Sequence, residues 1–427
     1  MRTLILAGGA ATLAAYIALA ITQAKLGSPL FFAIVAVPCA VYCLLAKHLL
    51  AADAPPASQV PLDRLLLIAL LLAAAFRTPL LVRAVDARSD MIRYIYDGRV
   101  QRLGYNPYLI VPSDPAVAAT HTDATREMPS INSPTPYPAA AQLFFRLMVT
   151  IDESARTMKL GLVACDLLTI AVLIAWLRSA NRSPWLALMY AWNPLVVLEV
   201  AHSGHIDALA TLWIAVSAWM LSTGRGMRAA IALVLAVATK LLPIVLLPLF
   251  WRRIRIRDAA AGAIVLALLY APFASAGTVP LGAVPNVVAH IRFNGPAFNG
   301  LALILTPDVA AAFALMAGLT IAAWMRARTA PDDPAAWGWP MAVSLAFAPV
   351  VYPWYLLSFT PFLFARSCGA LVAWTVAVLP VYAVWELARH GHRWFVPAPL
   401  VFVEYGVVVL VLALTLRPTS SARSRLP

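Results

Sequence analysis

The chain has 427 residues, of which 62% are hydrophobic and only 12% are charged, and its formal net charge is +13. Soluble domains carry about 25% charged residues, so this composition, together with many long apolar runs, indicates a polytopic membrane protein and excludes an ordinary soluble enzyme. The excess of Lys and Arg lies mostly in short loops, where it sets membrane orientation, and no basic–aromatic segment indicates a nucleic-acid partner.

Apolar runs predict an all-α fold with membrane spans along the whole chain. They cover residues 3–22, 30–50, 62–83, 158–178, 185–202, 206–223, 229–250, 259–275, 306–325, 338–352, 354–365, 369–388 and 398–416. The run 229–250 has Lys240 and Pro243 near its middle, where lysine is costly in lipid and proline interrupts the helical hydrogen bonds. We expect two half-helices there, giving roughly 14 spans if both cross the membrane and about 12 if the segment is re-entrant.

One long loop, 84–157, separates the third and fourth predicted spans. It contains the stretch "RSDMIRYIYDGRVQRLGYNPY", residues 88–108, whose apolar positions have helical spacing and whose Gly104 and Pro107 end the helix. After a Pro-rich passage, residues 139–149 form a second short amphipathic helix, of the kind that lies on a membrane surface. The loop is therefore expected to be ordered.

Basic residues in the short loops predict the orientation of the chain. They can all face the cytosol only if 229–250 enters the membrane and returns to the same side. The loop 84–157 then faces outside, as part of one domain that comprises residues 1–427. Polar residues from several outer turns gather on that face, and ionisable groups near a membrane are candidates for function.

Each of these residues also has a purely structural interpretation. Asp90 suits a helix N-cap, and the Asp97-Gly pair suits a turn. The turn that holds His205 and Asp207 could be a satisfied polar connection or, less in keeping with its spacing, a metal site. Lys240 could reach toward the interface, "YPWY" at 352–355 could be an interfacial aromatic belt, and Asp166 within the fourth span suits a helix–helix hydrogen bond.

The chemistry that fits a carboxylate with nearby cations at a membrane surface is glycosyl transfer from a lipid-linked sugar phosphate. A carboxylate takes the proton of an attacking hydroxyl, and cations stabilise a departing phosphate. The expected catalytic base is Asp90 and the expected phosphate ligands are Lys240, Arg93 and Arg292. Expected contacts to the sugar or the acceptor are Asp97, Tyr94, Asn106, Tyr108, Tyr137, His205, Asp207, Trp354 and Tyr355.

Five segments resemble motifs of the GT-C integral-membrane glycosyltransferases, in that family's order and over residues 86–362. They are "SDMIRYIYDGRVQRLGYNPYLIVPSDP", "INSPTPYPAAAQ", "NPLVVLEVAHSGHIDALA", "ATKLLPIVLLPLF" and "YPWYLLSFTPF". The bacterial branch that uses polyprenyl-phosphate-mannose is the most similar. The resemblance implies a GT-C fold in a bacterial plasma membrane, with an outer-leaflet site. It also implies an inverting transferase with Asp90 as base and Lys240 at the donor phosphate.

Two positions depart from the family pattern. Ser89 precedes Asp90 where relatives often have a second acidic residue, which weakens the case for a divalent metal, so we expect no cofactor. Ala139 takes the place of a second proline after Tyr137-Pro138, which leaves the acceptor open between a glycolipid and another glycan. Two other functions remain as alternatives: transfer of another sugar or of a polyprenyl-diphosphate glycan, and transport of a lipid or solute.

Overall fold

The computed structural model describes residues 1–51, 63–86, 89–275, 280 and 282–416, so Arg88 of the charged stretch lies outside the described residues. Within those ranges the chain is helical and forms no strand beyond isolated bridges such as Phe293–Val350. Eight helices are long and apolar enough to cross a membrane. The prediction of an all-α polytopic membrane protein is confirmed.

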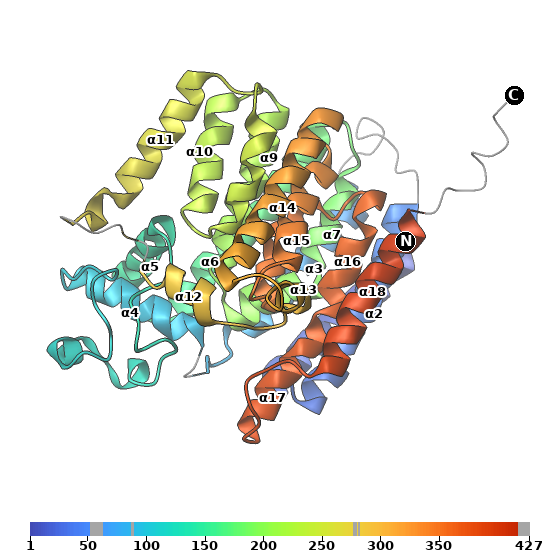
Figure 1. Ribbon diagram of the computed structural model, residues 1–427. Helices are drawn as coiled ribbons and strands as arrows, with labels where there is room; N and C mark the ends of the chain where they lie inside the picture. Colours follow the sequence, from blue (N-terminus) through green and yellow to red (C-terminus); the bar gives the residue numbers. More distant parts are fainter. Residues whose placement is uncertain (52–62, 87–88, 276–279, 281, 417–427) are drawn as a thin grey trace, which may run out of the picture.

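The eight long helical segments are distributed over the whole chain (Figure 1). They are η1–α1 (Leu4–Thr22), α2 (Pro29–Ala51), α3 (Arg64–Leu81), α6 (Ala155–Ser179), α11–η8 (Ile256–Phe273), α14 (Pro307–Arg328), the segment Arg366–Arg389, which ends in η11 (Leu379–Tyr382) and α17 (Ala383–Arg389), and α18 (Ala398–Thr415). The remaining apolar segments are shorter: α9 (Asp207–Ser222), α10 (Gly226–Val237), η7 (Leu242–Phe250), α15 (Pro334–Ala346) and η9 (Pro353–Phe362).

The described chain thus has fewer long helices than the roughly 12 to 14 spans expected from hydropathy. Proline is one reason, because it breaks the hydrogen-bond ladder and favours short or 3₁₀ pieces. Predicted span 185–202 is such a case: helices Pro184–Ala191 and Pro194–Ser203 meet at an angle of 56°. Asn193 caps the second piece by accepting from the Leu195 amide, and it donates to Tyr42 and Thr375 in other helices.

The segment around Lys240 enters the protein and returns to the same end, as the basic-loop argument requires. A Cβ built on Gly226, where α10 begins, would lie 2.7 Å from Asp258 and 3.2 Å from Ile254, which follow η7. At the other end, the Ala140 amide donates to the Ala238 carbonyl, so the break faces the loop 84–157. Helices of 12 and nine residues are each about 18 Å long, too short for a hydrocarbon core of about 30 Å.

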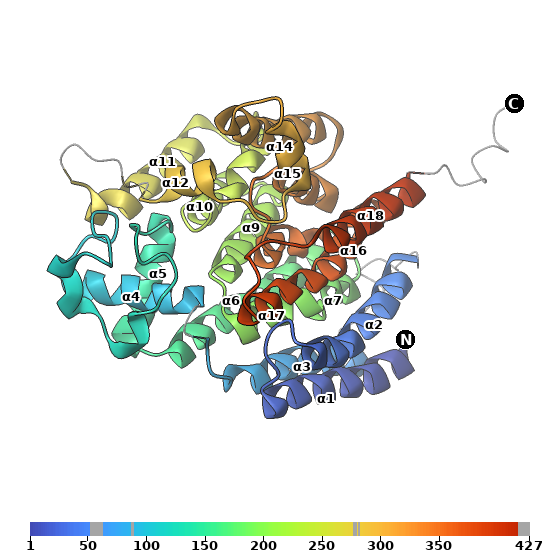
Figure 2. The same cartoon turned by 60° about the horizontal axis from the view of Figure 1, so that its bottom comes forward.

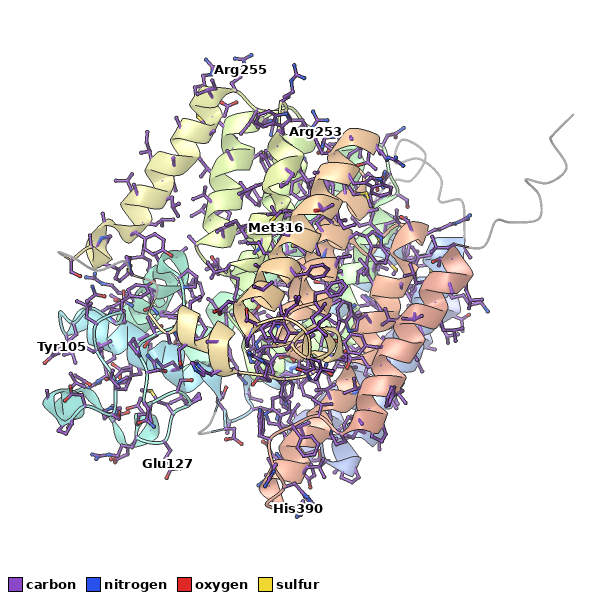
Figure 3. The ribbon with its side chains drawn as sticks, viewed as in Figure 1. Tyr105, Glu127, Arg253, Arg255, Met316 and His390 are labelled. Atoms are coloured by element: carbon purple, nitrogen blue, oxygen red, sulfur yellow. The ribbon has the colours of Figure 1, made fainter. Side chains whose placement is uncertain are left out.

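The two ends of the molecule differ in their charged residues and in their helices. Figure 3 shows Arg253 and Arg255 at one end, and Glu127 and His390 at the opposite end. Figure 2 brings the second end forward and shows the loop helices α4 (Asp90–Arg102) and α5 (Ala139–Ile151) beside α12 (Val284–His290), with α17 nearby. The two amphipathic helices predicted in loop 84–157 are therefore confirmed as helices.

A buried ion pair joins two spanning helices. Arg77 of α3 and Asp166 of α6 are 1% and 0% exposed, and their Nε and Oδ2 atoms lie 2.6 Å apart. Arg77 also donates to the carbonyls of Ala73 and Ala191, at 2.6 and 2.8 Å. Asp166 is thus a helix–helix contact, as its position in a span indicates, and its partner stabilises the charge that burial would otherwise penalise.

Helices α4 and α5 pack at a point where only glycine fits. A Cβ on Gly98 would lie 2.6 Å from the Phe145 carbonyl oxygen and 2.7 Å from a Val149 methyl group. We expect Gly98→Ala to push the helices apart and lower the free energy of unfolding by about 1–3 kcal/mol. Thermal unfolding of the detergent-solubilised protein measures this loss.

A matched glycine provides the control for that substitution. Gly406 in α18 has nothing within 4 Å of its Cβ position, so Gly406→Ala should leave the unfolding temperature unchanged or raise it slightly. Equal unfolding temperatures for the two variants would contradict the close α4–α5 packing.

Candidate functional site

Asp90 is the first residue of α4, and Ser89 takes the N-cap position by accepting a hydrogen bond from the Met91 amide. The structural interpretation of Asp90 as the cap is therefore wrong. In the described part of the chain, the half-buried Asp90 carboxylate makes no hydrogen bond and no ion pair. Both carboxylate oxygens, at the first residue of the helix, therefore lack a partner among the described residues.

The segment next to Asp90 is the turn between the π-helix η6 (Leu198–Ser203) and α9. Gly204 has a φ of +76°, and a Cβ on it would lie 1.8 Å from the Met91 methyl carbon. Only glycine fits this approach without strain. The contact packs the start of α4 directly against the turn that carries His205 and Asp207.

Asp207 and Lys240 form an ion pair between the start of α9 and the break after α10. Their Oδ2 and Nζ atoms lie 3.2 Å apart, and the lysine side chain is 19% exposed. The ammonium also lies 4.5 Å from the centre of the Tyr355 ring, a cation–π contact. Lys240 therefore contacts protein groups at the break.

His205 is held by a fully buried carboxylate. Its Nδ1 lies 2.6 Å from Oε2 of Glu199, a residue of η6 that is 0% exposed. The other oxygen of Glu199 accepts the hydroxyl hydrogen of Tyr382 in η11. The imidazole is itself 6% exposed, and its Nε2 has no hydrogen-bond partner among the described residues.

Four rings form a stack that we call the aromatic column: His205, Trp354, Tyr352 and Phe293. His205 lies on Trp354 with ring centres 4.0 Å apart and an angle of 10°. Trp354 lies on Tyr352 at 4.4 Å, and Tyr352 on Phe293 at 4.3 Å. Trp354 is thus buried against a histidine, a contact that an interfacial aromatic belt would not require. Flat rings of this kind suit a sugar face or an isoprenoid chain.

Electrostatic effects show that Asp90 belongs with these groups. Burial raises the pKa of Tyr94 well above its ordinary value, and the charges of Asp90 and Asp207 raise it further. Burial lowers the pKa of His205, but Glu199 and, to a smaller extent, Asp90 and Asp207 outweigh that effect, so the pKa lies above its ordinary value. These five side chains form what we call the polar cluster: Asp90, Glu199, His205, Asp207 and Lys240.

Two predicted site residues, Asp97 and Arg93, make buried contacts that hold the loop together. Asp97 is 0% exposed and accepts from Arg93 at 2.8 Å, from Thr135 at 2.6 Å and from Gln142 at 2.9 Å. Arg93, 2% exposed, also donates to the Ser130 carbonyl. A carboxylate with three donors holds α4, the Pro-rich passage and α5 together.

The tyrosines and Asn106 hold the loop against the rest of the protein. Tyr94 is stacked on Phe145 at 4.5 Å, and Tyr137 meets the same two rings edge-on. Tyr108 donates to the Tyr137 carbonyl at 2.8 Å, and Asn106 donates to a carbonyl of η8 at 2.9 Å. Tyr94 and Tyr137 border the polar cluster, while Asn106 and Tyr108 anchor the loop to the end of α11.

Arg292 lies in the segment between α12 and α13 (Pro296–Leu301). Its guanidinium donates to the carbonyls of Ala289 and Ile291, both at 2.8 Å, and lies over the Phe298 ring at 4.6 Å. The next residue, Phe293, ends the aromatic column, so the segment meets the site through that ring.

The residue that sequence reasoning missed is Glu199. Glu199 lies in an apolar run, six positions before His205. The sequence alone does not distinguish a single acidic residue there from the other polar residues of the turn. The π-helix and the left-handed Gly204 bring the two side chains together, and neither feature has a strong sequence signal. The feature that could have identified Glu199 as a site residue is its position as an acidic residue inside a predicted span.

No protein-family model matches the chain, and no curated protein matches it. Among the described residues, no group of three or more His, Cys, Asp or Glu side chains is arranged to hold a metal ion. The fold and the site define a helical polytopic membrane protein with a cluster of ionisable groups where the long loop meets the helices.

Proposed function

We propose that the protein is a glycosyltransferase that moves a hexose, mannose by the resemblance, from a polyprenyl monophosphate to a glycolipid or glycan acceptor. The observation that carries this proposal is the polar cluster, in which Asp90, a carboxylate without a partner among the described residues, lies with Lys240 and His205. A base and cations in one place are what transfer from a phosphate leaving group requires.

In this mechanism Asp90 takes the proton of the acceptor hydroxyl as the oxygen attacks the anomeric carbon. Attack from the face opposite the phosphate inverts that carbon, as the resemblance implies. The bond from the anomeric carbon to the phosphate oxygen breaks, and the polyprenyl phosphate leaves with the bonding electrons. Positive charge near the phosphate lowers the barrier, because negative charge develops on it in the transition state.

The proposed setting is a bacterial plasma membrane with the site facing outside, where lipid-linked donors present their sugars. It is supported by the separation of ends: Arg253 and Arg255 lie at one end, and Glu127 of the long loop lies at the other (Figure 3). Lys and Arg favour the cytosolic side. The aromatic column would then lie near the outer leaflet.

The test of this proposal is donor consumption by the purified protein in nanodiscs. Polyprenyl-phosphate-mannose, polyprenyl-phosphate-glucose and a polyprenyl-diphosphate glycan are supplied separately with a glycolipid acceptor, and mass spectrometry follows each lipid. We expect a monophosphate sugar to be consumed and free polyprenyl phosphate to form in equal amount. Consumption of the diphosphate alone, or movement of intact lipid across vesicles without chemistry, would replace the proposal with one of its alternatives.

Lys240→Ala should weaken use of the donor more than use of the acceptor. We expect kcat/KM for the donor to fall by about 10- to 100-fold, since charge-assisted hydrogen bonds contribute about 1.5–3 kcal/mol. Steady-state kinetics with each substrate varied in turn measures the two effects. Equal losses for donor and acceptor would count against a phosphate role.

The ion pair with Asp207 requires a second variant as control, because Lys240→Ala leaves a buried carboxylate unpaired. The double variant Lys240→Ala/Asp207→Asn removes that unpaired charge. It should recover the unfolding temperature lost by the single variant and still use the donor poorly. Recovery of donor use together with stability would assign Lys240 to structure alone.

A further inference from the structure

We propose that Glu199 is a positioning residue that holds His205 as an imidazolium, and that its Nε2 binds the phosphate of the lipid-linked donor. This inference rests on the proposed function and adds to it, since it moves His205 from sugar contact to phosphate contact. The geometry has three parts: a carboxylate on Nδ1, an aromatic ring against the face of the imidazole, and an Nε2 in the polar cluster that has no partner in the described part of the chain.

The bond between Glu199 and His205 fixes which nitrogen faces the site. Glu199 is fully buried and its Oε2 lies 2.6 Å from Nδ1, so Nδ1 carries the donated proton. Tyr382 occupies the other carboxylate oxygen, and the Trp354 ring prevents rotation of the imidazole. Nε2 is then the ring nitrogen left to contact a ligand.

Two other cations near the site, Arg93 and Lys240, each have a carboxylate partner. Arg93 is bound to Asp97 and to the Ser130 carbonyl, and Lys240 shares its charge with Asp207. His205 is paired through Nδ1, and its Nε2 has no protein partner within the described residues, although the side chain is more than nine-tenths buried. A phosphate oxygen bound there would supply an acceptor for this N–H.

The charge on His205 is maintained by its surroundings. Glu199 from η6, Asp90 from α4 and Asp207 from α9 all favour the imidazolium, against the effect of burial. His202, also from η6, is a further titratable group whose charge is coupled to that of His205, and Lys240 from the break after α10 is paired with Asp207 beside it. Because the pKa of His205 lies above its ordinary value, the imidazolium is present below that pKa and is lost as the pH rises through it.

The proton transfers balance in the proposed reaction. The acceptor hydroxyl gives its proton to Asp90, and the departing polyprenyl phosphate takes a proton from Nε2 of His205. The sugar forms one bond to the acceptor oxygen and loses one bond to the phosphate oxygen. After release, the proton on Asp90 returns to solvent and His205 takes one up, so the protein is restored without any oxidant or other co-reactant.

The test measures binding of farnesyl phosphate, a lipid monophosphate without sugar, to the full chain in detergent across a pH series. Wild type should lose affinity as the pH rises, and His205→Gln should bind about tenfold more weakly at the acidic end. Glu199→Gln should bind as wild type does at the acidic end of the series. As the pH rises, its affinity should fall at a lower pH than that of wild type, because the carboxylate no longer favours the imidazolium. Ionisation of the probe itself is common to all variants and cancels between them.

A matched control is the exposed pair of Glu386 and His390, 3.1 Å apart on α17 and the turn after it. Glu386→Gln should give the wild-type curve. An unmoved pH dependence for Glu199→Gln, whether its curve superimposes on that of wild type or is only displaced to lower affinity, would overturn the inference, since a purely structural Glu199 would not move the pH dependence. The alkaline limb of kcat against pH should move in the same direction.

Two further results decide between the possible outcomes, one if a variant does not fold and one if no sugar is transferred. If Glu199→Gln does not fold, ¹⁵N-histidine NMR of wild type, assigned with His205→Gln, reports the protonation state directly. A neutral imidazole at a pH near its ordinary pKa of about 6.5 overturns the inference. If farnesyl phosphate binds as described but no donor sugar is transferred, the proposed function fails while the phosphate site stands.

Discussion

Asp90→Asn should lower kcat by about 10²- to 10⁴-fold while the protein still folds and still binds the donor. The amide has nearly the shape of the carboxylate but cannot accept the proton of the acceptor hydroxyl. Because Asp90 makes no hydrogen bond or ion pair among the described residues, the substitution removes no contact of the fold. Steady-state transfer from a lipid-phosphate sugar, together with donor binding at equilibrium, measures both parts of the expectation.

The control for this variant is Asp97→Asn. Asp97 is a second carboxylate on the same helix, but it accepts three hydrogen bonds in the interior of the loop. Asp97→Asn should lower the unfolding temperature, whereas Asp90→Asn should not. Near-normal turnover of Asp90→Asn would remove Asp90 as the base, and equal thermal losses would contradict the difference between the two environments.

The largest effect on stability is expected from Asp166→Leu. This substitution leaves the Arg77 guanidinium buried between spanning helices without its carboxylate partner. Breaking a buried pair in this way costs about 3–5 kcal/mol, because the remaining charge has no compensation. Unfolding of the purified protein in mild detergent, followed by Trp fluorescence against temperature, measures the loss.

The double variant Arg77→Met/Asp166→Leu separates unpaired charge from lost attraction. It places apolar side chains of similar volume in the two positions, and such replacements are often neutral or stabilising. We expect most of the lost unfolding temperature to return. If the double variant is as unstable as the single one, Arg77 stabilises the fold through its hydrogen bonds to backbone carbonyls instead.

Much of the fold follows from patterns that the sequence shows directly. Long uninterrupted apolar runs become the spanning helices, and the helical spacing after Ser89 becomes α4. The break at Lys240 and Pro243 follows from the cost of a buried ammonium and of proline, and the chain does return to the same end there. These are local properties, so a single sequence suffices to predict them.

The pairing of side chains across the site could not be predicted in the same way. Nothing in the spacing of Arg93 and Asp97 distinguishes a phosphate ligand from a buried pair, since both interpretations place them one helical turn apart. Lys240 meets Asp207 and His205 meets Glu199 through tertiary contacts that depend on a π-helix, a left-handed glycine and a bent pair of helices. Such irregular elements have weak sequence signals.

The central claim is that Asp90, His205 and Lys240 contact one ligand, and an experimental structure with bound farnesyl phosphate tests it most directly. The account predicts phosphate density within hydrogen-bond distance of Nε2 of His205 and Nζ of Lys240. The Asp90 carboxylate should face the side on which the sugar would lie. Phosphate bound at the opposite end, beside Arg253 and Arg255, or separated from Asp90 by packed side chains, would contradict it.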